Sequence, residues 1–286
     1  MPYAKSTDGT RLYYKDWGAG DPVVLLHGWP LTGDTFDDAA VALAEAGKRC
    51  IVPDRRGFGR SDQPWDGYDY DTFADDVAAI LDDAGISEPV SMVGFSMGGG
   101  EVARFLTRQG AGRVSKAVLI SAVVPYMAKT DDNPNGVPKA TFDAMTAGMK
   151  KDRAAFFTGF FKDFFGPSVS DEVRRDAWRQ AMVAGLRPTL AAAQAFATTD
   201  FRPDMANFTV PTLIIHGTED ATVPIDATAR ESAKAIPGAE LIEYDGSAHG
   251  LLATDKERLI GDLVAFLGGS AGTDQRSAIP LTATAQ

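Results

Sequence analysis

The alternation of short apolar segments with amphipathic helical patterns constrains the fold of this chain more than any other feature. Apolar runs occur at residues 22–26, 50–52, 90–93, 117–120, 212–215 and 241–244. Helical patterns follow them near residues 33–46, 71–84, 97–109, 226–235 and 254–267. Apolar strands joined by helices are typical of a parallel sheet that is covered on both faces. The sequence therefore predicts an α/β fold with a mostly parallel central sheet.

This pattern is interrupted once, between residues 125 and 205, where strand signals disappear. The segment is rich in Phe, Met and Ala, with pairs of Phe at 156–157, 160–161 and 164–165. We expect a helical cap that packs its aromatic side chains on the core and encloses an apolar substrate pocket. The core domain would then comprise residues 1–124 and 206–268.

Charge and composition narrow the range of partners. The net charge of −11 disfavours nucleic acid and anionic membranes, because both would repel the chain. The N-terminus lacks the apolar segment of a signal peptide, and no apolar run is long enough to span a membrane. We expect a cytoplasmic protein, with homo-oligomer formation left open.

Two further features concern single segments of the chain. Cys50 cannot form an internal disulfide and is interpreted as a small core residue. The Gly/Ser/Thr-rich tail at 269–286 has little to bury and is expected to be disordered.

A candidate nucleophile lies at residues 94–98, which read Gly-Phe-Ser-Met-Gly. This segment fits the G-x-S-x-G elbow, and it stands between an apolar strand and a helix, as the elbow requires. The glycines allow a strained turn that exposes the hydroxyl of Ser96, and the helix N-terminus favours negative charge beside it. Ser96 is therefore the predicted nucleophile.

A serine nucleophile needs a base, and the chain has three histidines. In folds with this elbow the order along the chain is serine, acid, histidine, which leaves His216 and His249. His249 has an acidic loop upstream of it and is the predicted base. His27 is interpreted as a residue that orders a loop beside the oxyanion site, and His216 as a packing residue at a strand end.

The acid is sought in the loop that follows the strand at 212–215. Glu219 and Asp220 are neighbours there, and we favour Asp220, with Asp226 and Asp245 as lesser candidates. Such an acid holds the imidazole tautomer and stabilises the imidazolium without taking the proton.

The oxyanion produced by attack needs two backbone N–H donors. One is expected from Met97, directly after the nucleophile, and the other from Trp29 in the His-Gly-Trp-Pro loop at 27–30. Pro30 has no N–H and restricts the backbone of Trp29, which would fix the direction of the Trp29 carbonyl. Pro30 is therefore a candidate for positioning substrate or peroxide.

Several segments together resemble the bacterial cofactor-free haloperoxidases, also called non-haem chloroperoxidases, and the related aryl esterases of the α/β-hydrolase fold. They are residues 27–30, 54–65 and 94–104 and the loops of Asp220 and His249. The resemblance covers residues 3–267, including the cap. The Gly-Trp-Pro segment is similar to perhydrolase-leaning members. The Asp-Arg-Arg-Gly-Phe-Gly-Arg-Ser segment and the Ser-Met pair are similar to esterase-leaning ones.

The resemblance implies a serine esterase of small acyl and aryl esters with a perhydrolase side activity, in which hydrogen peroxide replaces water. It implies no cofactor, and the few His and Cys residues lack metal-ligand spacing. Perhydrolysis as the main activity, hydrolysis of lactones or amides, and a non-enzymatic receptor are the alternatives. The intact Ser96, Asp220 and His249 disfavour the receptor.

Overall fold

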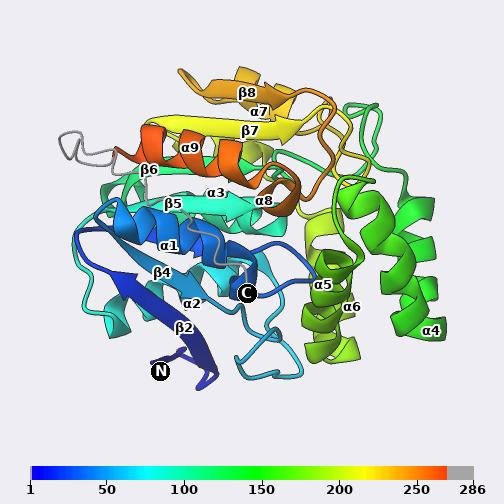
Figure 1. The fold of residues 1–286 in the computed structure, drawn as a ribbon, viewed down its shortest axis with the longest axis horizontal. Coiled ribbons are helices and arrows are strands. Elements are labelled where there is room, and N and C mark those ends of the chain that lie inside the picture. Colours follow the sequence, from blue (N-terminus) through cyan, green and yellow to red (C-terminus); the bar gives the residue numbers. More distant parts are fainter. Residues whose placement is uncertain (1, 269–286) are drawn as a thin grey trace, which may run out of the picture.

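A mixed sheet of eight strands forms the centre of the molecule in the computed structural model, which describes residues 2–268 (Figure 1). The predicted disordered tail lies outside the described residues. The strands are β1 (Tyr3–Lys5), β2 (Arg11–Gly18), β3 (Asp21–Leu26), β4 (Lys48–Pro53), β5 (Val90–Phe95), β6 (Val114–Ile120), β7 (Thr212–Gly217) and β8 (Glu240–Tyr244). They are arranged in the order β1-β2-β4-β3-β5-β6-β7-β8. Strands β3 to β8 run parallel, whereas β1 and β2 are antiparallel to their neighbours.

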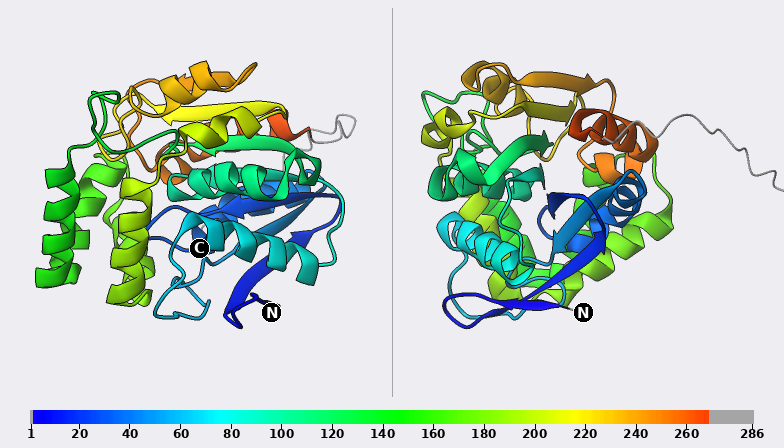
Figure 2. Two further views of the ribbon diagram at one scale, coloured as in Figure 1. Left: turned by 180° about the vertical axis from the view of Figure 1, so that it is seen from behind. Right: turned by 90° about the vertical axis from the view of Figure 1, so that its left-hand side faces the viewer.

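Helices cover both faces of this sheet, as predicted (Figure 2). One face carries α1 (Asp37–Glu45), α8 (Leu251–Thr254) and α9 (Lys256–Leu267), and the other carries α2 (Tyr70–Asp83), α3 (Met97–Gln109) and α7 (Ala229–Ala235). Short 3-10 helices occur at η1 (Gly33–Phe36), η2 (Ala111–Arg113) and η3 (Arg202–Asn207). The pattern near 226–235 becomes a helix only from Ala229, and the one near 254–267 is split into α8 and α9.

The central strands are apolar because helices bury them from both sides. Every residue of β5 and β7 is buried, which explains their continuous apolar runs. Cys50 on β4 is fully buried, and burial raises the pKa of its thiol to about 12. No helix within residues 2–268 combines the length and apolarity needed to cross a membrane.

The interrupting segment forms three helices, α4 (Lys139–Phe165), α5 (Asp171–Val183) and α6 (Leu186–Thr198). They stand beyond the edge of the sheet at which the parallel strands end (Figure 1). Non-helical backbone at Asp152 interrupts α4. We propose that these helices form a cap on a core made of the remaining elements. The η3 helix, which the predicted boundary assigns largely to the cap, packs on α3 of the core.

Candidate active site

Ser96 lies in a sharp turn between β5 and α3. Its backbone has φ 54° and ψ −116°, a region that L-residues rarely occupy. The flanking glycines permit this turn because side chains would collide there. A Cβ at Gly94 would lie 2.4 Å from the carbonyl oxygen of Gly98, and one at Gly98 would lie 2.1 Å from that of Leu26. The backbone of the turn at Ser96, the start of α3 and the end of β3 therefore approach one another closely, and glycine at positions 94 and 98 makes this approach possible.

The structure brings Ser96, His249 and Asp220 together from three loops at the same edge of the sheet. Nε2 of His249 lies 3.0 Å from Oγ of Ser96, and Nδ1 of His249 lies 2.6 Å from Oδ2 of Asp220. All three residues are buried. These contacts match a nucleophile, a base and an acid that orients the base.

Asp220 is held by backbone as well as by the imidazole. Its Oδ1 accepts hydrogen bonds from the N–H groups of Thr222, at 2.9 Å, and Val223, at 2.8 Å. Burial alone would raise the pKa of this carboxyl. The charge of His249 and the contacts with His249 and His216 outweigh burial and hold the pKa below its usual value. Asp220 is therefore ionised over the neutral range and free to stabilise an imidazolium.

The competing acids lie elsewhere. Glu219 is exposed, and Asp226 forms a surface ion pair with Arg230. Asp245 is exposed and lies 3.4 Å from the hydroxyl of Thr218. None of these three side chains lies within hydrogen-bond distance of His249, in contrast to Asp220.

The loop that carries His249 is tied both to the sheet and to α4. The hydroxyl of Ser121 donates to the carbonyl oxygen of His249 at 3.3 Å, and the N–H of Gly250 donates to the carbonyl of Phe164 in the cap at 2.9 Å. The rings of Phe95 and Phe164 flank the imidazole, with centroids 5.1 and 4.7 Å away. Sequence reasoning missed these supports, because nothing local links Ser121 or Phe164 to His249.

The proposed oxyanion loop lies directly against the nucleophile. A Cβ at Gly28 would lie 2.9 Å from Cβ of Ser96, so only glycine fits there. Trp29 is buried, and its indole N–H donates to the carbonyl of Thr189 on α6 at 3.0 Å. The peptide bond between Trp29 and Pro30 is cis, an isomer that sequence analysis did not anticipate. On the other side of Ser96, the N–H of Met97 opens α3 and therefore has no partner within its helix.

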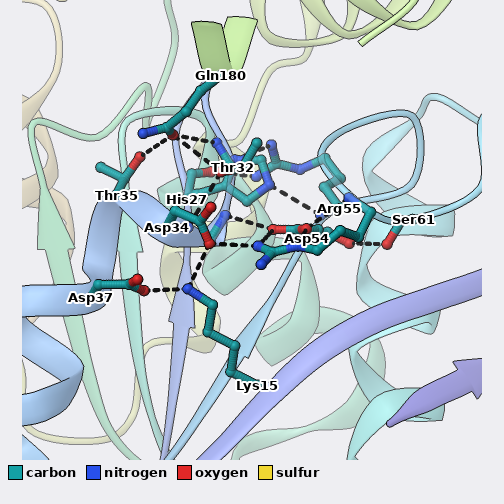
Figure 3. A network of polar contacts seen from close by, with 12 residues as sticks. Lys15, His27, Thr32, Asp34, Thr35, Asp37, Asp54, Arg55, Ser61 and Gln180 are labelled. Atoms are coloured by element: carbon teal, nitrogen blue, oxygen red, sulfur yellow. Dashed lines mark hydrogen bonds and ion pairs between the residues drawn. The ribbon is translucent and has the colours of Figure 1, made fainter. Parts of the chain in front are cut away.

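A buried network supports this loop from below (Figure 3). Nε2 of His27 accepts from the backbone N–H of Arg55 at 3.0 Å, which leaves the proton on Nδ1, 2.9 Å from the carbonyl of Gly28. Arg55 donates to the carbonyl of His27 at 2.5 Å and forms a buried ion pair with Glu101. Burial, aided by the charge of Arg55, holds the pKa of His27 well below its usual value. His27 thus orders the loop as a neutral residue.

The arginines of the 55–60 segment are all paired within the protein. Arg56 is fully buried and binds Asp76 at 2.5 Å, and Arg60 binds Asp54 at 2.6 Å. Asp54 also accepts from the N–H of Gly33 at 2.8 Å. This cluster organises the turn near the elbow and leaves no arginine of the segment as an unpaired cation.

The cap is joined to the core by a few side-chain contacts. Oε1 of Gln180 on α5 lies within hydrogen-bond distance of the N–H of Thr32, at 3.2 Å, and of the hydroxyls of Thr32, at 3.1 Å, and Thr35, at 3.2 Å (Figure 3). Gln63 makes a similar pair of contacts with Val183 and Gly185, at 3.2 and 2.7 Å. The residue type alone could not reveal these contacts, because the side chain of a surface glutamine is usually solvated.

Ser96 and Trp29 open into a cavity of about 480 Å³ between core and cap, a size usual for small-molecule sites. Its walls are mostly apolar, with the carboxylate of Asp163 and the hydroxyls of Thr141 and Thr222 among them. The apolar side chains are Val123, Met127, Val137, Phe142, Met145, Phe156, Phe160, Phe196 and Val223, among others. The aromatic segment of the cap thus forms a pocket wall as well as packing on the core. Within residues 2–268, no group of three or more His, Cys, Asp or Glu side chains could hold a metal ion.

Comparison with known proteins identifies the family of this chain. Residues 21–256 match the family model described as the alpha/beta hydrolase fold, so the chain is an α/β hydrolase. It is 46% identical to the non-heme chloroperoxidase of Kitasatospora aureofaciens and 42% identical to a bifunctional esterase/perhydrolase of Acinetobacter calcoaceticus, covering 93% of this chain and 99% of each relative. A solved bromoperoxidase from Bacillus anthracis superposes with a TM-score of 0.90 at 43% identity, covering 93% of this chain and 99% of that one.

These likenesses extend over nearly the whole chain, including the cap. The chain belongs to the non-haem haloperoxidase family of the α/β hydrolases. The predicted fold and family are confirmed. It is accordingly an enzyme from a family with esterase and peroxidase-type members.

Proposed function

We propose that this enzyme hydrolyses small carboxylic esters through an acyl-enzyme on Ser96 and forms peracids as a side activity when hydrogen peroxide replaces water. The observation that carries the proposal is the continuous chain of contacts from Ser96, which lines a mostly apolar cavity, through His249 to Asp220. The names of the relatives support both activities.

In the acylation step, Oγ of Ser96 attacks the ester carbonyl while its proton passes to Nε2 of His249. Asp220 stabilises the imidazolium so formed. The negative charge on the carbonyl oxygen would be met by the N–H groups of Trp29 and Met97, each typically worth ~2.7–4 kcal/mol in the transition state. His249 then gives its proton to the leaving alcohol, and the acyl group stays on Ser96.

In the second step, water or hydrogen peroxide attacks the acyl-enzyme as His249 removes its proton. Water yields the carboxylic acid, and peroxide yields the peracid; both regenerate Ser96. A peracid released into solution transfers its terminal oxygen to halide, giving hypohalite and the carboxylic acid. The apparent haloperoxidase reaction then needs no redox group on the protein.

The cavity indicates the substrate class. Its wall of Phe, Met and Val side chains suits an aryl or medium-length alkyl group, because burial of apolar surface supplies the binding energy. Asp163 is the charged residue of the lining and would repel an anionic substrate. We propose neutral esters as substrates, with hydrogen peroxide as the competing nucleophile.

A panel of p-nitrophenyl esters of increasing acyl length, assayed with and without peroxide, tests this proposal. We expect turnover of neutral esters, a maximum at intermediate acyl length, and peracid only when peroxide is present. The Ser96→Ala variant should lose both products together. Peracid formation that survives in Ser96→Ala would contradict a shared acyl-enzyme.

A further inference from the structure

A second histidine lies against the catalytic acid. His216, near the end of β7, is fully buried, and its Nε2 lies 3.1 Å from Oδ2 of Asp220. The same nitrogen lies 2.9 Å from the carbonyl oxygen of Val223. Oδ2 of Asp220 is the oxygen that also contacts His249, so the two imidazoles share one carboxylate oxygen.

The contacts of His216 determine its tautomer. Nε2 faces two oxygens that can only accept, so this nitrogen must carry the proton. Nδ1 is buried without a hydrogen-bond partner among the described residues, so a second proton there would be an unsatisfied donor. His216 is therefore assigned as neutral, with its N–H directed at Val223 and the edge of Asp220.

Burying His216 with one unpaired nitrogen lowers the stability of the fold, so this residue needs a role beyond packing. His216 lies in a fully buried strand, where an apolar side chain would pack without a polar atom, and it leaves one nitrogen unpaired within residues 2–268. A buried polar atom without a hydrogen-bond partner calls for a reason other than packing, and a catalytic role is one such reason. The loop from Gly217 to Val223 folds back on itself. Nε2 of His216 therefore lies between the carbonyl oxygen of Val223 and the carboxylate of Asp220.

We propose that His216 is a positioning residue for catalysis: its Nε2–H holds the Asp220 loop closed and keeps Oδ2 directed at His249. Without this N–H, the loop relaxes at Val223 and Oδ2 is no longer held toward His249. The carboxylate then stabilises the His249 imidazolium less, and turnover falls. His216 contacts Asp220 and not Ser96, so it acts through Asp220.

The titratable groups near His216 and Asp220 each have a partner in the structure. Asp220 is faced by His249 from the loop after β8 and by His216 from β7. Glu243 on β8 lies opposite His216 in the sheet register, and its carboxylate is paired with Arg230 of α7 at 2.7 Å. That pair is partly exposed and is left intact by changes at His216.

The test compares two substitutions at this position. His216→Phe keeps the ring but removes the N–H, and His216→Gln removes the ring but keeps an amide N–H near the position of Nε2. For His216→Phe we expect kcat on an ester to fall about tenfold to a hundredfold, as for one lost hydrogen bond to a charged group, with KM little changed. The acid limb of the kcat/KM profile, which reports the general base, should move to lower pH because a less stabilised imidazolium is easier to deprotonate. His216→Gln should recover most of kcat and the original acid limb.

Thr212→Val is the matched control, because it removes a hydroxyl from the other end of the same buried strand. It should leave kcat and the acid limb unchanged. Wild-type activity and an unmoved limb in His216→Phe would overturn the proposal. So would equal loss in the Phe and Gln variants with no movement of the limb, because that pattern indicates packing alone.

A measurement on the wild-type protein keeps the proposal testable if the variants fold poorly. Nitrogen NMR of histidine-labelled protein should show His216 protonated at Nε2 and unprotonated at Nδ1 across the pH range of activity. A proton on Nδ1, with Nε2 bare, would overturn the proposed contact with Asp220.

Discussion

The core and the cap use different interactions to build one site. In the core, buried polar groups are paired by specific hydrogen bonds, such as His249 with Asp220 and Arg55 with Glu101. In the cap, the site is bounded mainly by ring packing. The Trp29 ring, for example, lies 5.5 Å from Phe160 and 5.6 Å from Phe196. The difference implies that core changes affect turnover and stability, whereas cap changes affect substrate binding.

The largest expected effect concerns His249 and Asp220, the proposed base and acid of the core. His249→Ala should lower kcat by about five to six orders of magnitude, because Ser96 loses its base. Asp220→Asn should cost about four orders, because the tautomer and the charge that orient the base are lost. Initial rates on a p-nitrophenyl ester measure both.

Glu219→Gln is the matched control for the acid, because it neutralises the exposed neighbour of Asp220. Near wild-type kcat is expected. If Glu219→Gln lost as much activity as Asp220→Asn, the acid would be misassigned and the contrast between buried and exposed carboxylates would fail.

The next effect is on stability and involves the ion pair beneath the oxyanion loop. Glu101→Gln leaves the buried charge of Arg55 uncompensated, which typically costs about 3–5 kcal/mol. Urea unfolding should show a lower free energy of unfolding by that amount, whereas Glu88→Gln at an exposed position should change it little. If Glu101→Gln lowers the free energy of unfolding by less than about 1 kcal/mol, paired buried charges stabilise the core no more than they stabilise the cap.

The third prediction concerns Pro30, where the core loop meets the cap. A fixed Trp29 carbonyl could accept a hydrogen bond from peroxide as it attacks, and a difference of ~1.4 kcal/mol changes partitioning tenfold. Pro30→Leu should therefore lower the ratio of peracid to acid from one ester, by up to about tenfold, in a folded protein.

Pro237→Leu, at an exposed position between α7 and β8, is the control and should leave the ratio unchanged. An unchanged ratio in Pro30→Leu would assign Pro30 a purely structural role.

The smallest effect is expected at the contact between cap and core. Gln180→Ala removes the acceptor shared by Thr32 and Thr35, a net loss of about 1 kcal/mol that corresponds to roughly fivefold. We expect KM for a bulky aryl ester to rise severalfold, with kcat changed less than about twofold. Gln194→Ala, at an exposed position on α6, should leave both constants unchanged. A fall in kcat with constant KM would show that the cap contributes to the chemical step. It would contradict the assignment of turnover to the core and of substrate binding to the cap.

Much of this molecule follows from local sequence. The strained turn at Ser96 needs glycine at 94 and 98, so its motif is visible in five residues. Strand and helix periods report burial directly, because side-chain direction repeats every two or 3.6 residues. Chain order and the small number of histidines then selected His249, and the acidic loop suggested Asp220.

Other features were decided only by the tertiary structure, since they join residues far apart in the chain or turn on side-chain direction. The contact of Gln180 with Thr32 spans 148 positions, and that of Arg55 with Glu101 spans 46. The sequence predicts only a packing role for His216, because a sequence does not say which atoms a buried ring faces. Its contact with Asp220 depends on how the loop after β7 folds back. Local propensity and periodicity determine which elements form, and close packing at the edge of the sheet determines which side chains meet.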